Sequence, residues 1–267
     1  MIAAAASAQN PDTMMPEASA AKAKQILAQM LDAMGGPAYL SVRESQCSGK
    51  LSRFGHNNDL TTYLTFKEYW HYPGKYRIDY GKKGNIIDLF SDKEGWTLDH
   101  DGVSDESAEN LYEFQMRVIK DPVNLLRYRL KEQGLAYRYA GSDIIDLKPV
   151  DLVELVDSYG RIYRIAVQKE NHLMVRFTVI MEDPTTHDRT EEVTSYANYH
   201  PLEGVMTPLQ VVRTRDGRRT LQAFYDTCSY NPNLAANFFS RAGLDQRFSE
   251  VGSHTDKRKA ANAKDRD

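Results

Sequence analysis

The segment Leu60–His71 alternates between two kinds of side chain, and this alternation restricts the possible folds more than any other feature. Large apolar residues such as Phe66 and Trp70 share one parity, whereas Lys67 and Tyr69 share the other. Because side chains of a β-strand point alternately to opposite faces of a sheet, a period of two predicts a strand. The segment therefore predicts a long strand with one apolar face and one amphipathic face.

The same period and suitable turn residues recur through most of the chain. Pro73-Gly74 and Lys83-Gly84-Asn85 separate alternating runs up to residue 98, which predicts an antiparallel meander. Asp216-Gly217 between two such runs is the strongest hairpin signal. Together the runs predict about eleven strands. Those of the second half are expected over residues 135–140, 143–157, 160–169, 172–182, 190–199, 205–214 and 218–230.

Two parts of the sequence have a helical period instead. Between residues 19 and 34, apolar residues including Ala23, Ile26 and Met30 recur on a single helix face, and Gly35-Gly36-Pro37 ends the pattern. Residues 105–133 interrupt the β pattern with helical spacing, and Asp121-Pro122 marks the start of a second helix. A helical insertion between two β halves is therefore expected.

These elements predict one mainly β domain over residues 19–250, in which a strongly curved antiparallel sheet is covered by the N-terminal amphipathic helix and by the insertion. Residues 1–18 are expected to be a flexible N-terminus or a signal-peptide remnant. Ala6-Ser7-Ala8 resembles a cleavage site, but a basic start and a full apolar core are missing. Residues 251–267 combine basic and acidic residues without large apolar ones, which predicts a disordered tail.

The composition excludes several classes of protein. A net charge of −3 disfavours a nucleic-acid-binding surface, which needs a basic field. No apolar run reaches the roughly 18–20 residues of a membrane-spanning helix. The 16 tyrosines favour sheet, because aromatic side chains suit a pleated, half-buried surface.

The chemistry-bearing residues predict no catalytic site, no metal site and no cofactor. No two histidines lie at helical ligand spacing, and Asp99-His100-Asp101 has the composition of a solvated turn. A G-x-S-x-G elbow, a phosphate-binding loop and a dinucleotide fingerprint are all missing from the sequence.

Cys47 and Cys228 lie near the start of the expected sheet and in its last strand. In an exported protein they could form a disulfide. Each could instead be a small residue of the core, and the sequence leaves both interpretations open.

The apolar faces of the expected strands carry large side chains that form the candidate ligand-binding set. This set comprises Leu64, Phe66, Trp70, Ile78, Trp96, Phe177 and Val179. One interpretation is ordinary core packing. The other is a pocket for an acyl chain, in which each buried methylene contributes roughly 0.8 kcal/mol.

The order of features resembles a known family. The features are the helix ending in Gly35-Gly36, the run from Tyr72 to Asp79, the turn with Gly95-Trp96, the insertion with Asp121-Pro122 and Leu125-Leu126, the run from Asn198 to Pro208, the hairpin at Asp216-Gly217 and the stretch from Asn233 to Phe239. In this order they resemble the LolA-like outer-membrane lipoprotein-sorting proteins.

The resemblance implies an unclosed β-barrel with a helical lid, located in the periplasm. It implies a non-enzymatic carrier that binds lipid or lipoprotein acyl chains in an apolar cavity between sheet and helices. Relatives of this family also sense envelope stress, so an envelope sensor or adaptor acting through protein–protein contacts is the alternative. The expected partners are thus lipid or lipoprotein acyl chains and envelope proteins, with no nucleic acid and with the protein as a monomer.

Overall fold

The computed structural model describes residues 11–182 and 186–250. The expectations for the first ten residues and for the tail over 251–267 lie outside the described residues.

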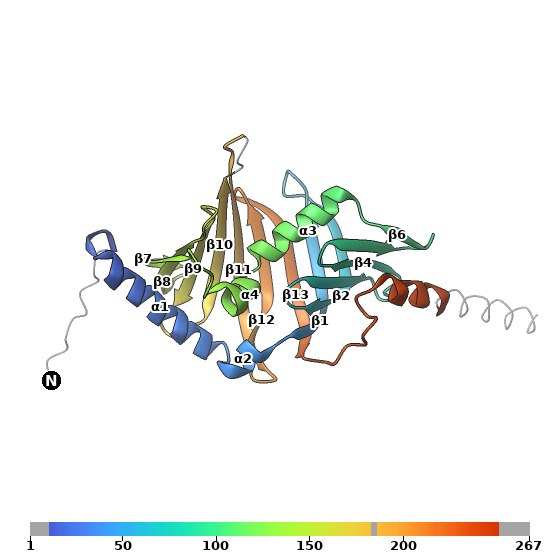
Figure 1. The fold of residues 1–267 in the computed structure, drawn as a ribbon, viewed down its shortest axis with the longest axis horizontal. Coiled ribbons are helices and arrows are strands. Elements are labelled where there is room, and N and C mark those ends of the chain that lie inside the picture. The colour runs from blue at the N-terminus through green and yellow to red at the C-terminus, as the bar shows by residue number, and fades with distance from the viewer. Residues whose placement is uncertain (1–10, 183–185, 251–267) are drawn as a thin grey trace, which may run out of the picture. The chain divides into compact units, whose positions relative to one another are not determined.

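The strands form one 13-stranded sheet that is mainly antiparallel (Figure 1). The strands before the helical insertion are β1 (Glu44–Phe54), β2 (Leu60–His71), β3 (Lys75–Tyr80), β4 (Ile86–Ser91), β5 (Glu94–Leu98) and β6 (Val103–Asp105). Those after it are β7 (Ala136–Ile145), β8 (Lys148–Val156), β9 (Ile162–Gln168), β10 (Met174–Glu182), β11 (Arg189–Leu202), β12 (Val205–Arg215) and β13 (Arg218–Tyr230).

The strand order runs from β6 back to β1, continues to β13, and then descends to β7. The two edges are thus β6 and β7, and no ladder among the described strands joins them. The predicted fold class, a mainly antiparallel and unclosed sheet with accompanying helices, is confirmed.

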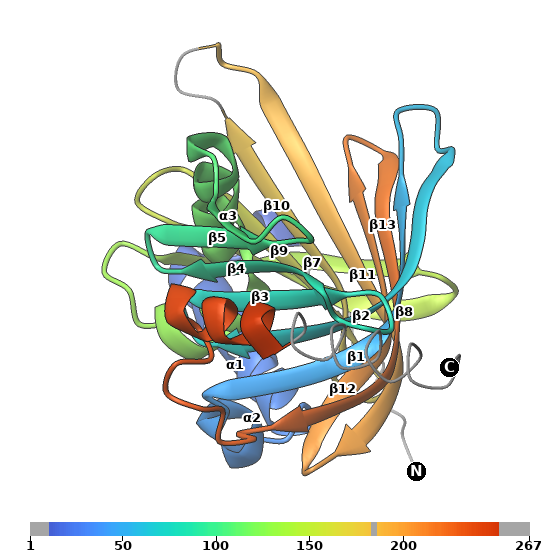
Figure 2. The same ribbon diagram turned by 90° about the vertical axis from the view of Figure 1, so that its right-hand side faces the viewer.

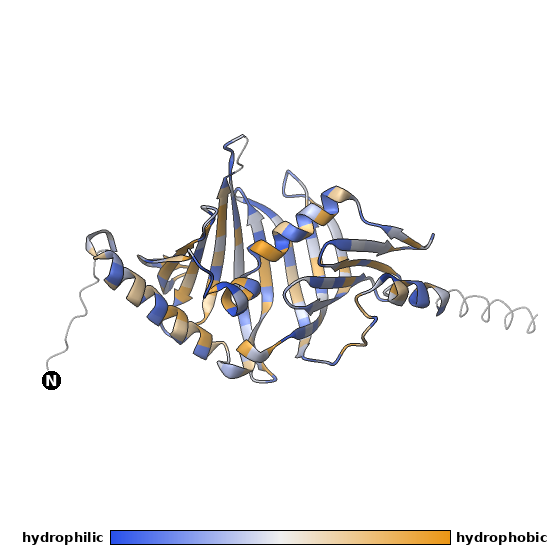
Figure 3. Ribbon diagram, viewed as in Figure 1, coloured by the Kyte–Doolittle hydropathy of each residue, from blue (hydrophilic) through white to orange (hydrophobic). Residues whose placement is uncertain are grey.

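The helices lie mostly where the sequence predicts helical structure. They are η1 (Pro11–Thr13), α1 (Pro16–Ala33), α2 (Pro37–Ser41), α3 (Ala108–Lys120), α4 (Pro122–Asn124) and η2 (Leu125–Arg129), and residues 241–250 are helical as well. Hydrophobic and hydrophilic residues are interspersed along α1 and α3 (Figure 3). α1 begins at Pro16. Proline has no backbone N–H to donate, but the N–H groups of the first helical turn have no partner within the helix, so proline costs nothing at this position.

The chain divides into two compact units. Unit 1 comprises Met1–Ser41, Ser52–Thr62 and Leu125–Phe224, and unit 2 comprises Val42–Leu51, Tyr63–Asn124 and Tyr225–Asp267. Three of the boundaries between them fall inside β1, β2 and β13, and the other two fall between α2 and β1 and between α4 and η2.

In unit 1, the apolar side of α1 covers β7 and β8. Ser19 of α1 accepts a hydrogen bond from the backbone N–H of Tyr139 at 2.9 Å. After the helix, Gly35 has φ +123°, and an added Cβ would lie 2.3 Å from the carbonyl oxygen of Gly204. Only glycine fits this close approach, so it is needed at the end of the helix for a structural reason.

In unit 2, the C-terminal helix over residues 241–250 lies against the meander (Figure 2). Its Leu244 is fully buried in a cluster with Ile87, Leu89 and Leu98. Ser240 caps the helix, since its Oγ accepts a hydrogen bond from the N–H of Gly243 at 3.2 Å. This helix is not among the elements predicted from the sequence, although the capping serine and the spacing of Leu244 and Phe248 are signals for it.

The strand boundaries differ from the prediction in two places. The predicted break between residues 140 and 143 is a β-bulge around Gly141, and the actual turn of this hairpin lies at Asp146-Leu147. β1 and β6 are additional strands; β6 is short, and β1 is too polar to show a clear period. The hairpin at Asp216-Gly217 is confirmed, since Arg215 pairs directly with Arg218.

The structure joins Cys47 and Cys228 in a disulfide across a sequence separation of 181. A cross-link over so long a loop limits the freedom of the unfolded chain. Replacing both cysteines with alanine is therefore expected to lower the free energy of unfolding by about 5 kcal/mol, as measured by urea denaturation.

The cross-link has a direct chemical check. Denatured but unreduced protein should contain no thiol that reacts with Ellman's reagent, and thiols should appear after reduction. Two free thiols before reduction would contradict the bond.

Candidate functional site

The candidate site in unit 2 is an aromatic face formed by alternate residues of β2, β3 and β4. Trp70 pairs with Tyr76 across β2 and β3, and Tyr76 pairs with Phe90 across β3 and β4. Directly paired residues of neighbouring strands point to the same side of a sheet. Their rings therefore gather on one side, where those of Trp70 and Tyr76 lie 4.6 Å apart. We call this set, with Phe66 of β2, the aromatic face.

Helix α3 covers the aromatic face through Phe114. The ring of Phe114 stacks on Phe90 at 4.6 Å and lies 6.4 Å from Trp70. Phe114 is the one buried residue among the 13 residues of α3, all of which the structure describes. A helix with so little buried apolar surface contributes little free energy to its own docking. α3 is therefore the element of this site that is easiest to displace.

A carboxylate lies on the same side of the sheet. Glu68 accepts a hydrogen bond from the hydroxyl of Tyr225 at 2.7 Å and another from the hydroxyl of Tyr76 at 3.1 Å. Burial strongly raises the pKa of both tyrosines, so both keep the protons that they donate. Glu68 is thus held by two donors that both belong to strands.

Arg117 brings a positive charge from α3 to this carboxylate. Its guanidinium lies 4.1 Å from the ring centre of Tyr76 and 5.5 Å from that of Trp70. Burial alone would lower the pKa of Arg117, but the attraction of Tyr76 and Glu68 outweighs it and raises the pKa. Arg117 therefore stays charged and stacks on the aromatic face.

The structure brings part of the predicted ligand-binding set together. Phe66, Trp70 and Ile78 are buried, and they share the side covered by α3, as Ile78 pairs with Glu68. Leu64 has the same parity in β2 and is half-buried. These four residues form one candidate surface.

Trp96 lies on the opposite side of the sheet. It pairs with Leu89, which in turn pairs with Arg77, and Arg77 alternates with the residues of the aromatic face. There Trp96 packs against the buried cluster around Leu244. The register of the β4–β5 hairpin, which the sequence does not reveal, decides this placement.

Phe177 and Val179 lie in β10 of unit 1. Both are buried, and the ring of Phe177 lies 6.2 Å from that of Tyr163. They pack within unit 1, whereas the aromatic face belongs to unit 2.

The polar part of the site and the residues that α3 contributes are not among the site residues predicted from the sequence. These residues are Glu68, Tyr76, Phe114, Arg117 and Tyr225. The helical spacing of Phe114 and Arg117 was a usable signal. The approach of Glu68 to Tyr225 had none, because 157 residues separate them.

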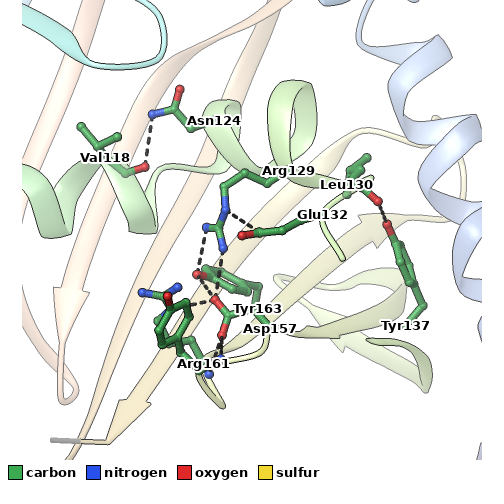
Figure 4. Close-up of polar contacts among 10 residues, drawn as sticks. Val118, Asn124, Arg129, Leu130, Glu132, Tyr137, Asp157, Arg161 and Tyr163 are labelled. Atoms are coloured by element: carbon green, nitrogen blue, oxygen red, sulfur yellow. Dashed lines mark hydrogen bonds and ion pairs between the residues drawn. The ribbon is translucent and has the colours of Figure 1, made fainter. Parts of the chain in front are cut away.

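A buried carboxylate of unit 1, that of Asp157, has a structural role (Figure 4). Its Oδ2 accepts hydrogen bonds from Arg161 at 2.6 Å, from Arg129 at 3.1 Å and from the hydroxyl of Tyr163 at 3.1 Å. The backbone N–H groups of Tyr159 and Arg161 donate to its Oδ1. Burial would raise the pKa of Asp157, but these hydrogen bonds outweigh burial and lower it. With this many donors, the carboxylate is fully occupied in fixing the chain.

Other kinds of site find no support in the described part of the chain. There, no group of three or more histidine, cysteine, aspartate or glutamate residues could hold a metal ion. None of the described helices combines the length and the apolar character that a membrane span requires.

Solved structures of other proteins share this fold. The structure is similar to a DUF1329 family protein from Desulfovibrio piger, with 14% identity, a TM-score of 0.58 and coverage of 85% of this chain and 99% of that chain. A LolA superfamily protein from Nitrosomonas europaea gives 12% identity, a TM-score of 0.52 and coverage of 83% and 99%. A putative outer membrane lipoprotein-sorting protein domain from Vibrio parahaemolyticus gives 11% identity and a TM-score of 0.54, with coverage of 86% of this chain and 100% of that chain.

Neither a protein-family model nor a curated protein sequence matches this chain. The structural similarities nevertheless cover most of it. The predicted resemblance to the lipoprotein-sorting proteins is therefore confirmed at the level of the fold.

The hydrogen bonds of Glu68 give the first prediction for the site. Glu68→Leu should lower the free energy of unfolding by about 2–4 kcal/mol, because it leaves two buried hydroxyls without an acceptor. Glu68→Gln keeps an acceptor and should cost less than half as much. Urea denaturation of both variants measures the difference, and equal losses would contradict the assigned hydrogen bonds.

Asp157 gives a prediction that depends on pH. At pH 7, Asp157→Asn should lower the free energy of unfolding by about 3 kcal/mol, since two arginines lose a buried partner. The pKa of Asp157 lies below its ordinary value of 3.8, so its contribution is complete above that pH and decreases as the pH falls below it.

Urea denaturation at pH 7 and at pH 3 tests this dependence. The difference between the wild type and Asp157→Asn should be smaller at pH 3. Asp146→Asn, in the exposed turn between β7 and β8, is the matched control and should change the free energy by less than about 0.5 kcal/mol. A difference that grows in acid would contradict the assigned pKa shift.

Proposed function

We propose that this protein is a non-enzymatic carrier of the periplasm that binds lipid or lipoprotein acyl chains against the aromatic face, beneath α3. The observation that carries the proposal is the way α3 is held: one buried phenylalanine seats an amphipathic helix on a surface of large aromatic side chains. The fold, which is shared with LolA superfamily structures, supports the same function.

The magnitudes favour exchange of Phe114 for an acyl chain. Exposing one phenylalanine side chain costs about 3 kcal/mol at most, whereas burying about ten methylenes contributes roughly 8 kcal/mol. Part of that gain is lost to ordering the chain and to restricting its motion on binding. Before these costs, the gain from the chain exceeds the loss of Phe114 burial by roughly 5 kcal/mol, so the apolar contribution of an acyl chain can replace that of Phe114.

The polar group on this face does not oppose the displacement. Glu68 receives its hydrogen bonds from Tyr76 on β3 and Tyr225 on β13. These donors stay in place when α3 moves, so the carboxylate is never left without partners. Only Arg117 would leave with the helix, and its long side chain can reach water.

The two tryptophans allow a direct test of the proposal. Trp70 lies on the aromatic face, whereas Trp96 lies on the other side of the sheet. In a Trp96→Phe variant, a fatty acid brominated along its chain should quench the remaining Trp70 fluorescence, since bromine quenches at short range. In a Trp70→Phe variant, the same fatty acid should leave the Trp96 fluorescence nearly unchanged.

Mass spectrometry of protein purified from cells should also find bound lipid. Absence of quenching at saturating fatty acid, together with absence of bound lipid, would contradict the carrier. Quenching of Trp96 alone would place the lipid elsewhere. A protein partner retained in stoichiometric amount without lipid would favour the envelope sensor or adaptor.

A further inference from the structure

A pocket lies in unit 2, on the side of β2 and β3 opposite to the aromatic face. Its volume is about 370 Å³, and it is lined by strand residues such as Lys67 and Arg77, by the turn over residues 81–84 and by the C-terminal segment. Arg77 pairs with Tyr69 across the strands, and both alternate with the residues that α3 covers. The pocket is therefore distinct from the proposed acyl site.

The floor of the pocket is built from buried groups. Arg77 is bound to Asp79 through two hydrogen bonds, Nε to Oδ1 at 2.7 Å and Nη2 to Oδ2 at 3.0 Å. The Arg77 guanidinium stacks 4.2 Å from the ring centre of Phe238, and the same ring meets Tyr69 edge-on at 4.7 Å. These contacts fix the C-terminal segment over the strands.

The opposite wall is the start of the helix over residues 241–250. A Cβ added to Gly243 would lie 2.2 Å from the carbonyl oxygen of Asn237, so no side chain fits there. This close approach brings Arg247 to the rim, where its Nη2 donates to the carbonyl of Lys83 at 3.3 Å. The helix and the β3–β4 turn thus meet at the mouth of the pocket.

The charges around the pocket do not balance. Its lining has five basic residues, Lys67, Arg77, Lys82, Lys83 and Arg247, and two acidic residues, Asp79 and Glu250. Asp79 is neutralised by Arg77, and Glu250 accepts from Gln246 at 3.2 Å. Across the described chain, Lys67, Lys82 and Lys83 form no ion pair with an acidic side chain.

Tyr69 adds a hydrogen-bond donor to this basic lining. Burial, followed by the charge of Asp79, raises the pKa of Tyr69, so the phenol keeps its proton. The lining can therefore offer ammonium, guanidinium and hydroxyl donors to one ligand.

We propose that this pocket binds a phosphate group, either in a soluble phosphate ester or in the headgroup of an anionic phospholipid. A phosphate monoester carries a charge of about −1.5 to −2 and accepts several hydrogen bonds, which suits clustered lysines and an arginine. A single carboxylate would leave most of these positive charges uncompensated.

The test uses the full-length protein with a pocket variant and a control of equal charge change. The pocket variant is Lys82→Glu with Lys83→Glu, both exposed in the β3–β4 turn. The control is Lys50→Glu with Lys93→Glu, which are exposed in the same unit but do not line the pocket. Calorimetric titration with glycerol phosphate at low salt should show binding that weakens about tenfold or more in the pocket variant only.

Cosedimentation with vesicles distinguishes the two sources of phosphate. Binding to vesicles of phosphatidic acid, whose headgroup is a phosphate monoester, but not to glycerol phosphate would assign the pocket to lipid headgroups, whereas the reverse would assign it to soluble esters. Either result supports the proposal, provided that the pocket variant loses binding and the control keeps it within about twofold. Equal losses in both variants, or no binding to either probe by the wild type, would overturn it.

Discussion

β1 pairs with β13, and the rest of the sheet depends on this pairing. Every other neighbour in the strand order is also a neighbour in sequence, so the remaining ladders form from hairpins and consecutive strands. Closing the loop between β1 and β13 costs chain entropy that grows with its length. The Cys47–Cys228 bond, formed between the same two strands, offsets part of this cost. At the end of the pairing, the Asn231 side chain accepts from the N–H of Arg43 at 2.7 Å and from that of Glu44 at 3.1 Å.

The dependence on this distant pairing explains what the sequence could and could not predict. The hairpin at Asp216-Gly217 was predictable, because its turn residues alone favour it. β1 was not, because its neighbour β13 lies at the far end of the chain and its own sequence is polar. The predicted break between strands at Gly141 is instead a β-bulge. Glycine suits a turn and a bulge equally, and only the pairing with β8 distinguishes them.

The same reasoning applies to the candidate site. Phe66 and Trp70 share a face because they lie four positions apart in one strand. The period of two predicts this directly. Trp96 lies in another strand, and its side depends on the register of a hairpin. Glu68 and Tyr225 meet only through the distant strand pairing. A sequence pattern thus predicts the side of a residue within its own strand better than it predicts partners on other strands.

The two sites that we propose use the two sides of the same strands. Glu68 and Trp70 of β2 face α3, while Lys67 and Tyr69 face the C-terminal segment. Because alternate residues of a strand point in opposite directions, one strand can serve an apolar ligand and an anionic ligand without either reaching the other.

The ends of α3 decide what kind of movement an acyl chain would require. Before the helix, the N–H of Glu106 donates to the carbonyl of Gly95 at 2.9 Å, and the Glu106 carboxylate accepts from Thr97 at 2.6 Å. After it, Asn124 donates to the carbonyl of Pro73 at 3.0 Å. The helix is therefore held by polar bonds at both ends and, in its middle, by Phe114 and by Arg117, which stacks on Tyr76 and Trp70. Since these hydrogen bonds do not involve the aromatic face, the helix can release Phe114 while both ends stay attached, so the movement is confined to residues 108–120.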